Sequence, residues 1–316
     1  MASTNDTSDP VLFIVGPTAS GKTELAVSLA ERFNGEIVNA DSRQLYRRMD
    51  IGTAKPTAAE RERAVHHLID VAEPTEACGL AWFLDAAHLA VAEIRRLGRL
   101  PIICGGTGQF IRALLEAWQV PRVPPDPALR AAMECRLAEA GLPSLVEELR
   151  RVDPVAAGRI DIANPRRVMR ALEVATSRHH DPSPPAHRED LRHRLVIGIA
   201  VDRAALYERI DARVDAMFAV GFVDEVRALL DAGARCESVA FSAIGYREVC
   251  DFLNGTRTLN EVVERSKLAT HRLARTQAGW FRGDDPRITW LASGVALTSE
   301  AIERVALFLD SSDRRG

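Results

Sequence analysis

The sequence predicts an α/β protein whose parallel sheet is covered by helices on both faces. Short apolar runs rich in β-branched residues recur at 11–15, 36–40, 100–106 and 194–201, with helical patterns between them. Strands that alternate with helices form parallel sheets buried on both faces. Each of the first three runs ends in a polar or glycine-rich segment. Because such sheets bind ligands at the carboxyl ends of their strands, these three segments should line one crevice.

The first strand leads directly into a phosphate-binding loop. The run GPTASGKT lies between the strand VLFIV and a helical stretch at 24–33, and its glycines let backbone N–H groups and the helix N-terminus converge on a phosphate. Lys22 would lie along the terminal phosphates, and the Thr23 hydroxyl is a candidate ligand for Mg²⁺. The predicted diphosphate-binding residues are Gly16, Pro17, Thr18, Ala19, Ser20, Gly21, Lys22 and Thr23. The core is therefore P-loop NTPase-like, although kinases, NTPases and other transferases share this loop.

The second strand is followed by NADSRQLY, which places Asp41 just past the strand end. A carboxylate at that position faces the phosphate site in an open α/β sheet. Three interpretations remain open: an indirect ligand of Mg²⁺, a general base for an acceptor nucleophile, or the N-cap of a helix that starts near Ser42.

The third strand ends in GGTG, where Gly105, Gly106 and Gly108 flank Thr107. Glycines allow the backbone to approach a ligand closely, and a tight turn is the alternative explanation. This segment lacks the aspartate with which many P-loop NTPases hold Mg²⁺, and its absence disfavours ATP hydrolysis.

Between about 120 and 191 the strand signal disappears. Helical patterns occur at 128–140, 142–151 and 165–178, and the proline-rich runs PRVPPDP and HHDPSPPAHRED bound them. From 203 onward helices dominate, with a last strand at about 287–291. The expected parts are a catalytic core at 9–120 and 192–316, an inserted helical domain at 121–191 and a disordered tail at 1–8.

Composition and cysteine spacing indicate a cytoplasmic protein. With 316 residues and 47% hydrophobic content, the chain can bury a large core, and its longest apolar runs, such as 195–201, are too short to cross a membrane. The N-terminus lacks the apolar region of a signal peptide. The five cysteines are widely spaced without a CxxC pair, so we expect reduced thiols and neither a disulfide framework nor a zinc site. They are Cys78, Cys104, Cys135, Cys236 and Cys250.

The net charge of −3 does not favour nucleic acid as a partner, but the distribution of charge does not exclude it. Arginines gather at 159–178 and 265–287, and arginine grips phosphates and stacks on bases. Solvated helix faces would explain the same clusters. Trp280 and Phe281 fit either core packing or base stacking. For His66 and His67 the pattern favours a structural role over metal binding, because no third ligand lies at metal spacing.

Taken together, these segments resemble the tRNA dimethylallyltransferase family. The matching runs are collinear from about 11 to 282: GPTASGKT, DSRQLYRRMDIGTAKP, HHLID, PIICGGTG, NPRRVMRALEV, RVDAMFAVGFVDEV, AIGYRE and RLARTQAGWFR. The resemblance implies transfer of a dimethylallyl group from dimethylallyl diphosphate to the exocyclic N6 of the adenosine 3′ to the tRNA anticodon. The products would be N6-dimethylallyladenosine and diphosphate.

The resemblance also assigns roles to residues. It makes Asp41 the general base, places Thr107 between the two substrates, and gives Arg213 a contact with the diphosphate. Mg²⁺ would be the cofactor, held by Thr23, and ATP would not be needed. For this chain we expect a monomer without an obligate protein partner.

Chemistry on a base requires taking it out of its stack, and the resemblance implies that the insert and the C-terminal helices clasp the anticodon stem-loop. The implied tRNA contacts are Ser42, Arg43, Gln44, Asn164, Pro165, Arg166, Arg167, Val168, Ala243, Ile244, Gly245, Tyr246, Arg247, Glu248, Arg275, Gln277, Trp280 and Arg282.

This chain departs from the usual family motifs at several positions. Gln109 and Phe110 follow GGTG where Leu-Tyr is usual, which we expect to alter the wall of the prenyl pocket. In the late motif, His271 and Thr276 replace arginines and Gly279 replaces threonine, and fewer fixed charges should weaken phosphate contacts. Trp82 stands where an aspartate is common.

Three rival functions remain at this point: prenylation of free adenine nucleotides, a P-loop nucleotide kinase, and a non-catalytic RNA-binding P-loop protein. A small-molecule acceptor would not require the helical insert and the late basic helices. The complete set of Lys22, Thr23, Asp41, Thr107 and Arg213 disfavours a protein without catalytic activity.

Overall fold

The computed structural model describes residues 9–124, 126–177 and 188–313. The chain divides into two compact units, one formed by Met1–Trp118 with His187–Gly316 and the other by Gln119–Ala186. The expected tail at 1–8 and most of the proline-rich segment at 179–190 lie outside the described residues.

The larger unit is built on a six-stranded sheet in which every pair of neighbouring strands is parallel. The strand order is β3-β2-β4-β1-β5-β6, so β1 lies in the interior, between β4 and β5. The strands are β1 (Val11–Val15), β2 (Gly35–Asn39), β3 (His66–His67), β4 (Leu100–Cys104), β5 (Arg194–Ala200) and β6 (Thr289–Ala292). The parallel α/β prediction is confirmed, and the two-residue strand β3 is an addition to it.

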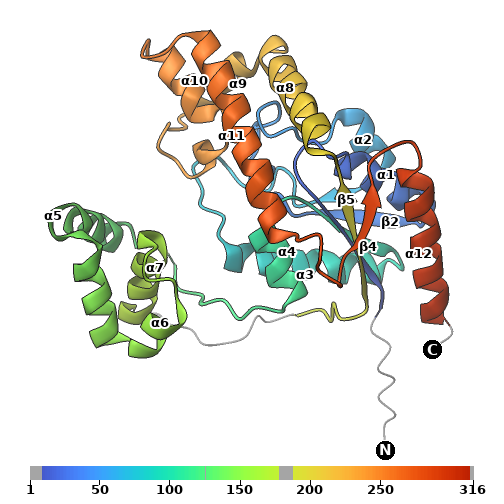
Figure 1. Cartoon of the computed structure of the whole chain (residues 1–316), viewed down its shortest axis with the longest axis horizontal. Helices are drawn as coiled ribbons and strands as arrows, with labels where there is room; N and C mark the ends of the chain where they lie inside the picture. Colours follow the sequence, from blue (N-terminus) through green and yellow to red (C-terminus); the bar gives the residue numbers. More distant parts are fainter. Residues whose placement is uncertain (1–8, 125, 178–187, 314–316) are drawn as a thin grey trace, which may run out of the picture. The chain divides into compact units, whose positions relative to one another are not determined.

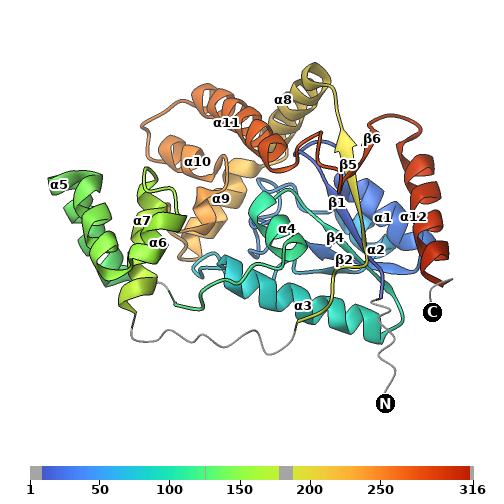
Figure 2. The same cartoon turned by 60° about the horizontal axis from the view of Figure 1, so that its bottom comes forward.

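Helices cover both faces of this sheet (Figures 1 and 2). Leu12 and Ile14 of β1 belong to the apolar cluster formed with α1 (Lys22–Arg32) and α12 (Leu297–Asp313). Helix α3 (Leu80–Arg96) packs against β2 and β4, and α4 (Gly108–Leu115) packs against α3. All five residues of β1 are buried, which explains its unbroken apolar sequence.

A second apolar cluster lies among the helices after β5 and includes Phe222, Phe241 and Tyr246. Its elements are α8 (Arg203–Ala219), α9 (Phe222–Asp231), the 3-10 turn η1 (Ala240–Ser242), α10 (Tyr246–Leu253) and α11 (Leu259–Trp280). Helix α11 packs against α8, α10 and α4, so it reaches from this cluster back to the sheet core.

The expectation that all cysteines are reduced is wrong for one pair. Cys236 and Cys250 form a disulfide, whereas Cys78, Cys104 and Cys135 are free. The hairpin of α9 and α10 brings the two positions together although 14 residues separate them in sequence. A pairing that depends on helix packing leaves no short cysteine motif in the sequence.

In the described part of the smaller unit, all regular secondary structure is helical. Its helices are α5 (Pro127–Val152), α6 (Pro154–Arg159) and α7 (Pro165–Thr176). Gly141, with φ of 74°, interrupts α5 at the point where the sequence separates two helical patterns. Met133, Leu145 and Val168 form its core. In the described parts of both units, no helix combines the length and apolarity that crossing a membrane requires.

Candidate functional site

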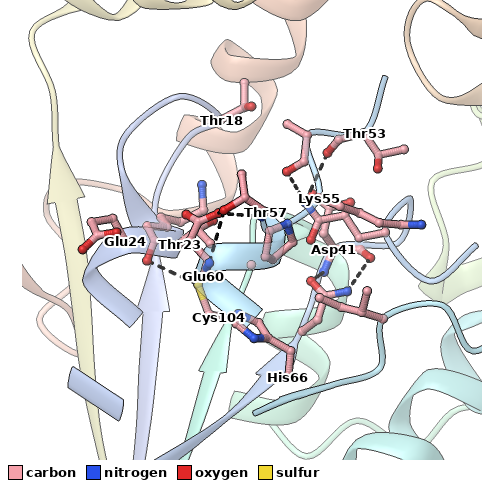
Figure 3. A pocket seen from close by; sticks show the side chains of 18 of the residues that line it. Thr18, Thr23, Glu24, Asp41, Thr53, Lys55, Thr57, Glu60, His66 and Cys104 are labelled. Atoms are coloured by element: carbon pink, nitrogen blue, oxygen red, sulfur yellow. Dashed lines mark hydrogen bonds between the residues drawn. The ribbon is translucent and has the colours of Figure 1, made fainter. Parts of the chain in front are cut away.

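A cavity of about 820 Å³ lies at the carboxyl ends of β1, β2 and β4. All three polar segments contribute to its wall, as the strand pattern predicts: Lys22 from the first, Asp41 from the second and Gly105 from the third. Arg213 of α8, Gln277 of α11 and residues of the segment 50–70 also line it. Figure 3 shows Thr23, Asp41 and Lys55 around this hollow.

The phosphate loop leads directly into helix α1. Gly21 adopts a left-handed conformation, with φ of 91°, and starts α1, whose free N–H groups therefore face the cavity. Lys22 Nζ donates a 2.5 Å hydrogen bond to the carbonyl of Pro17, within the loop itself. Ser20 Oγ is buried and has no hydrogen-bond partner among the described residues. An unpaired buried hydroxyl costs about 1–3 kcal/mol, so a ligand oxygen that accepted a hydrogen bond from Ser20 would remove this cost and bind more tightly.

The electrostatic state of Lys22 also favours an anionic ligand. The pKa of Lys22 is lowered to about 8, chiefly by burial and to a smaller extent by Arg213, while Cys104 and Asp41 oppose the shift. Burial also raises the pKa of the Cys104 thiol to about 12, which keeps it neutral. A diphosphate beside Lys22 would offset its lost hydration and stabilise the ammonium form.

Asp41 is held by the backbone around it. Its Oδ1 accepts a 2.9 Å hydrogen bond from the Arg43 amide, and its own amide donates to Asn39 Oδ1 at 3.1 Å. Among the described residues, no helix begins near Ser42; the next is α2 (Ala58–Arg63). The N-cap interpretation is therefore wrong, because a turn closed by the carboxylate replaces the helix. The Asp41 side chain lines the cavity.

Thr107 connects the second and third segments. Its Oγ1 accepts a 3.0 Å hydrogen bond from the Ser42 amide, and its amide donates to the Ala40 carbonyl at 3.3 Å. Thr107 is not among the residues that line the cavity, whereas Gly105 and Gly106 are. The hydroxyl thus fixes the segment that carries Asp41.

The glycines of GGTG are explained by close packing against protein atoms. A Cβ added to Gly105 would lie 2.3 Å from the Ala40 carbonyl carbon. One added to Gly106 would lie 2.4 Å from Gln277 Nε2, and one added to Gly108 would lie 2.1 Å from Trp280 Cγ. None of the three has a positive φ. Close packing therefore requires these glycines, whereas the φ angles of the turn do not, and at Gly106 and Gly108 the closely approaching group is a side chain of α11.

Two side chains that the sequence interpretation missed hold the part of the cavity wall formed by the segment 50–70. Lys55 is 8% exposed, and its Nζ donates to the carboxylates of Asp50 and Asp70 at 2.7 and 2.5 Å. The carboxylate of Glu225 accepts from the amides of Asp50 and Ile51 at 2.8 and 2.6 Å. The sequence could have pointed to Lys55, because it is one of only three lysines in the chain and lies in the run DIGTAKP. Glu225 lies in the matching run RVDAMFAVGFVDEV, but that run does not reveal its role, since its partners include backbone groups far away in sequence.

Comparison with known proteins identifies the family. A family model described as IPP transferase matches residues 44–284, and one described as isopentenyl transferase matches residues 10–71. The chain belongs to the IPP transferase family.

Relatives within this family match along nearly the whole chain. A tRNA dimethylallyltransferase of Roseiflexus sp. (strain RS-1) is 46% identical over 308 residues, which cover 96% of this chain and 99% of the relative. One from Chloroflexus aggregans (strain MD-66 / DSM 9485) is 48% identical over 278 residues, 86% of this chain and 92% of the relative.

Solved structures of the family have the same fold. The full-length tRNA isopentenylpyrophosphate transferase from Bacillus halodurans superposes with a TM-score of 0.71 at 36% identity, covering 97% of this chain and 99% of that one. A eukaryotic dimethylallyltransferase acting on tRNA has a TM-score of 0.77 at 25% identity, covering 96% and 80%.

The tRNA contacts expected of this IPP transferase near Asp41 have partners inside the protein. Arg43 donates to the Val239 carbonyl at 2.9 Å, and Gln44 Nε2 donates to the carbonyls of Thr53 and Ala54 at 3.1 and 3.0 Å. Ser42 bonds to Thr107 as described. These three residues hold the second segment in place.

On α11 the expected contacts differ in exposure. Arg275 and Arg282 are exposed, Trp280 is half-buried over Gly108, and Gln277 is only 6% exposed. Arg275 donates to the Tyr207 hydroxyl at 3.0 Å. Phe281, at 4% exposed, packs in the core. The late motif therefore presents arginines outward and directs Gln277 inward.

The segment 243–248 likewise has few free side chains. Ala243 and Tyr246 are buried, and the Tyr246 hydroxyl donates to Glu225 at 2.7 Å. Glu248 accepts from the Gly245 amide at 3.1 Å, and Ile244 is partly exposed. Arg247 is exposed.

In the helical unit, the run 164–168 begins α7. Asn164 Oδ1 caps the helix by accepting from the amides of Arg166 and Arg167, and Pro165 occupies the first turn. Val168 is fully buried in the core of this unit. The side chains of Arg166 and Arg167 are exposed.

The departures from the family motifs lie away from the cavity. Phe110 stacks on Phe83 with ring centroids 3.9 Å apart, and Gln109 is exposed; neither lines the cavity, and their effect on a prenyl pocket stays a prediction. His271 stacks on Tyr207 and its Nε2 lies 2.8 Å from Asp211 Oδ1. Thr276 and Gly279 are exposed on α11, and Trp82 is exposed on α3.

The structural interpretation of the histidine pair fits His67, whereas His66 lines the cavity and its buried Nε2 has no hydrogen-bond partner among the described residues. His67 Nε2 lies 2.5 Å from Glu36 Oε2, and His66 Nδ1 lies 2.9 Å from the Ala64 carbonyl. Within the described ranges, no three His, Cys, Asp or Glu side chains group as a metal site. A Mg²⁺ ion would fit the cavity in another way, because Mg²⁺ keeps several waters and binds through substrate phosphates and few protein oxygens. Thr23 lines the cavity at the phosphate loop and supplies such an oxygen.

Proposed function

We propose that this chain transfers a dimethylallyl group from dimethylallyl diphosphate to the exocyclic N6 of the adenosine 3′ to the anticodon in tRNA. The products are N6-dimethylallyladenosine and diphosphate. The observation that carries the proposal is the shared cavity: a phosphate loop with Lys22, the carboxylate of Asp41 and the guanidinium of Arg213 line one hollow in a chain of the IPP transferase family.

The donor's diphosphate is assigned to the phosphate loop. Charge builds up on the leaving diphosphate as the C–O bond to the allylic carbon breaks, so fixed donors there lower the barrier. The amides at the start of α1, the Ser20 hydroxyl, Lys22 and Arg213 provide these donors. Mg²⁺, held by Thr23 and the phosphates, would add positive charge at the leaving group.

The acceptor amine bonds to the allylic carbon and becomes cationic, and it must then lose a proton. Asp41 accepts that proton as general base. Its Oδ1 is engaged by the Arg43 amide, so Oδ2 is the oxygen available to the acceptor. The hydrogen bonds of Thr107 and Asn39 keep this carboxylate in place before the substrates arrive.

The tRNA is assigned to arginines of both units. Exposed arginines suit phosphate contacts that position an RNA. In the larger unit these are Arg247, Arg275 and Arg282, and in the helical unit Arg166 and Arg167. Trp280, half-buried over Gly108, is the aromatic side chain in this set. Action as a cytoplasmic monomer stays a prediction.

Diphosphate release from dimethylallyl diphosphate tests the proposal. We expect release that depends on an unmodified anticodon stem-loop and stops in Asp41→Asn. Release driven equally by AMP would favour the nucleotide-prenylating rival, and phosphate transfer from ATP to a nucleotide would favour the kinase.

A further inference from the structure

Gln277 of α11 bridges two of the segments that build the cavity. Its Oε1 accepts a 2.7 Å hydrogen bond from the Thr18 amide of the phosphate loop. Its Nε2 donates a 3.0 Å hydrogen bond to the Gly106 carbonyl in the turn after β4. The residue is 6% exposed and belongs to the cavity lining. One side chain therefore joins loops that are 88 residues apart in sequence, from 18 to 106.

The chemistry of these partners requires an amide. A backbone N–H can only donate and a carbonyl can only accept, so the orientation of the Gln277 amide is fixed by what it contacts. A methionine has a similar length but no donor, and an arginine has no acceptor. Gly106 completes the fit, since a Cβ there would lie 2.4 Å from Gln277 Nε2.

Neighbouring residues on the same face of α11 reinforce this bridge. Ala274, three residues earlier, is 2% exposed and shares an apolar cluster with Ala19 of the phosphate loop. Trp280, three residues later, covers Gly108. Residues three apart lie on one helix face, so α11 presses on the phosphate loop and on the turn after β4 along a single stripe.

We propose that Gln277 is a positioning residue for the diphosphate of the donor and does not contact tRNA. By engaging the Thr18 amide, it sets the path of the phosphate loop so that the remaining amides and Lys22 converge on the ligand. By engaging Gly106, it holds the loop in register with the turn that fixes Asp41 through Thr107. The role at the donor rests on the proposed function, whereas an effect on diphosphate binding does not.

The test compares Gln277→Met with the wild-type protein in binding and in catalysis. Inorganic diphosphate with Mg²⁺, titrated by calorimetry, reports on the phosphate loop without any reaction. We expect its Kd, and the KM for dimethylallyl diphosphate, to rise roughly tenfold, the effect of one unpaired buried backbone group. Affinity for the unmodified stem-loop should stay within about twofold. Gln119→Met, an exposed glutamine, is the matched control and should leave every value unchanged.

Gly106→Ala provides a second variant if Gln277→Met folds poorly. Its added methyl displaces Nε2, so it should weaken diphosphate binding in the same direction. Since both changes break one bridge, the double variant should be no worse than the stronger single variant. A loss of RNA affinity with unchanged diphosphate affinity would overturn the proposal and return Gln277 to the tRNA contacts. Unchanged Kd and KM would also overturn it. Weaker diphosphate binding in a protein that modifies no RNA would uphold the loop-positioning role and refute the proposed function.

Discussion

The Ser42 amide donates a 3.0 Å hydrogen bond to Thr107 Oγ1, and this bond joins the segment after β2 to the turn after β4. Asp41 immediately precedes Ser42, so the carboxylate proposed as base is fixed by a hydroxyl from another strand. The Thr107 amide, which donates to Ala40 at 3.3 Å, repeats the link on the other side of Asp41. Two residues assigned to catalysis therefore act through one connected piece of backbone.

Thr107→Val should lower the rate of dimethylallyl transfer roughly tenfold, because it leaves the Ser42 amide unpaired and frees the Asp41 segment. The change conserves side-chain volume, so the affinity for dimethylallyl diphosphate should change little. Thr107→Ser keeps the hydroxyl and should retain most of the rate. Single-turnover kinetics on the stem-loop separate these variants, and equal rates for valine and serine would contradict the role.

Asp41→Asn should reduce transfer by at least about a hundredfold, because an amide cannot accept the proton. Asparagine retains an Oδ1 that can accept from the Arg43 amide, so the local turn and the thermal unfolding midpoint should be preserved. Asp41→Ala removes both functions and serves as the comparison. Full activity in the asparagine variant would rule out general-base catalysis by Asp41.

Donor binding should weaken as pH rises through about 8, because burial lowers the pKa of Lys22 to about 8 and only the ammonium form offsets phosphate charge. Lys22→Arg keeps its charge and should give a flat profile of the donor KM between about pH 7 and 9. The free energy of unfolding should depend on pH in the opposite direction. The unfolded chain, with Lys22 near its ordinary pKa of 10.5, binds more protons above pH 8, so this group's contribution to stability rises with pH between 8 and 10.5. A wild-type KM that does not vary with pH would contradict the assignment.

Cys236→Ser should destabilise the larger unit under oxidising conditions by about 3 kcal/mol, as expected for a disulfide that closes a loop of about 15 residues. Added reductant should lower the unfolding midpoint of the wild-type protein toward that of the variant. The variant itself should not respond to reductant. The same midpoint for both proteins without reductant would show that the disulfide does not form.

Sequence reasoning located the site because its features are local. The phosphate loop, Asp41 and GGTG each follow a buried strand, and the geometry of a parallel sheet brings strand ends together without further information. The same reasoning found the break at Gly141, since glycine between two helical patterns marks a local stop. These predictions needed only periodicity and the properties of neighbouring residues.

The missed features depend on partners far away in sequence. The family resemblance places Gln277 among the tRNA contacts, but its hydrogen-bond partners are backbone groups 259 and 171 residues away. Glu225 binds amides about 175 residues away, and the pairing of Cys236 with Cys250 depends on how α9 packs on α10. The two-residue strand β3 is too short for a pattern.

The most direct test of the central claim is the mass of an unmodified anticodon stem-loop after incubation with the protein, Mg²⁺ and dimethylallyl diphosphate, with AMP and ATP treated in parallel. We predict the dimethylallyl increment on the RNA alone, at the adenosine 3′ to the anticodon. Replacing that adenosine by inosine, which lacks the N6 amine, should abolish the increment. An increment on a free nucleotide, or none on any acceptor, would contradict the account.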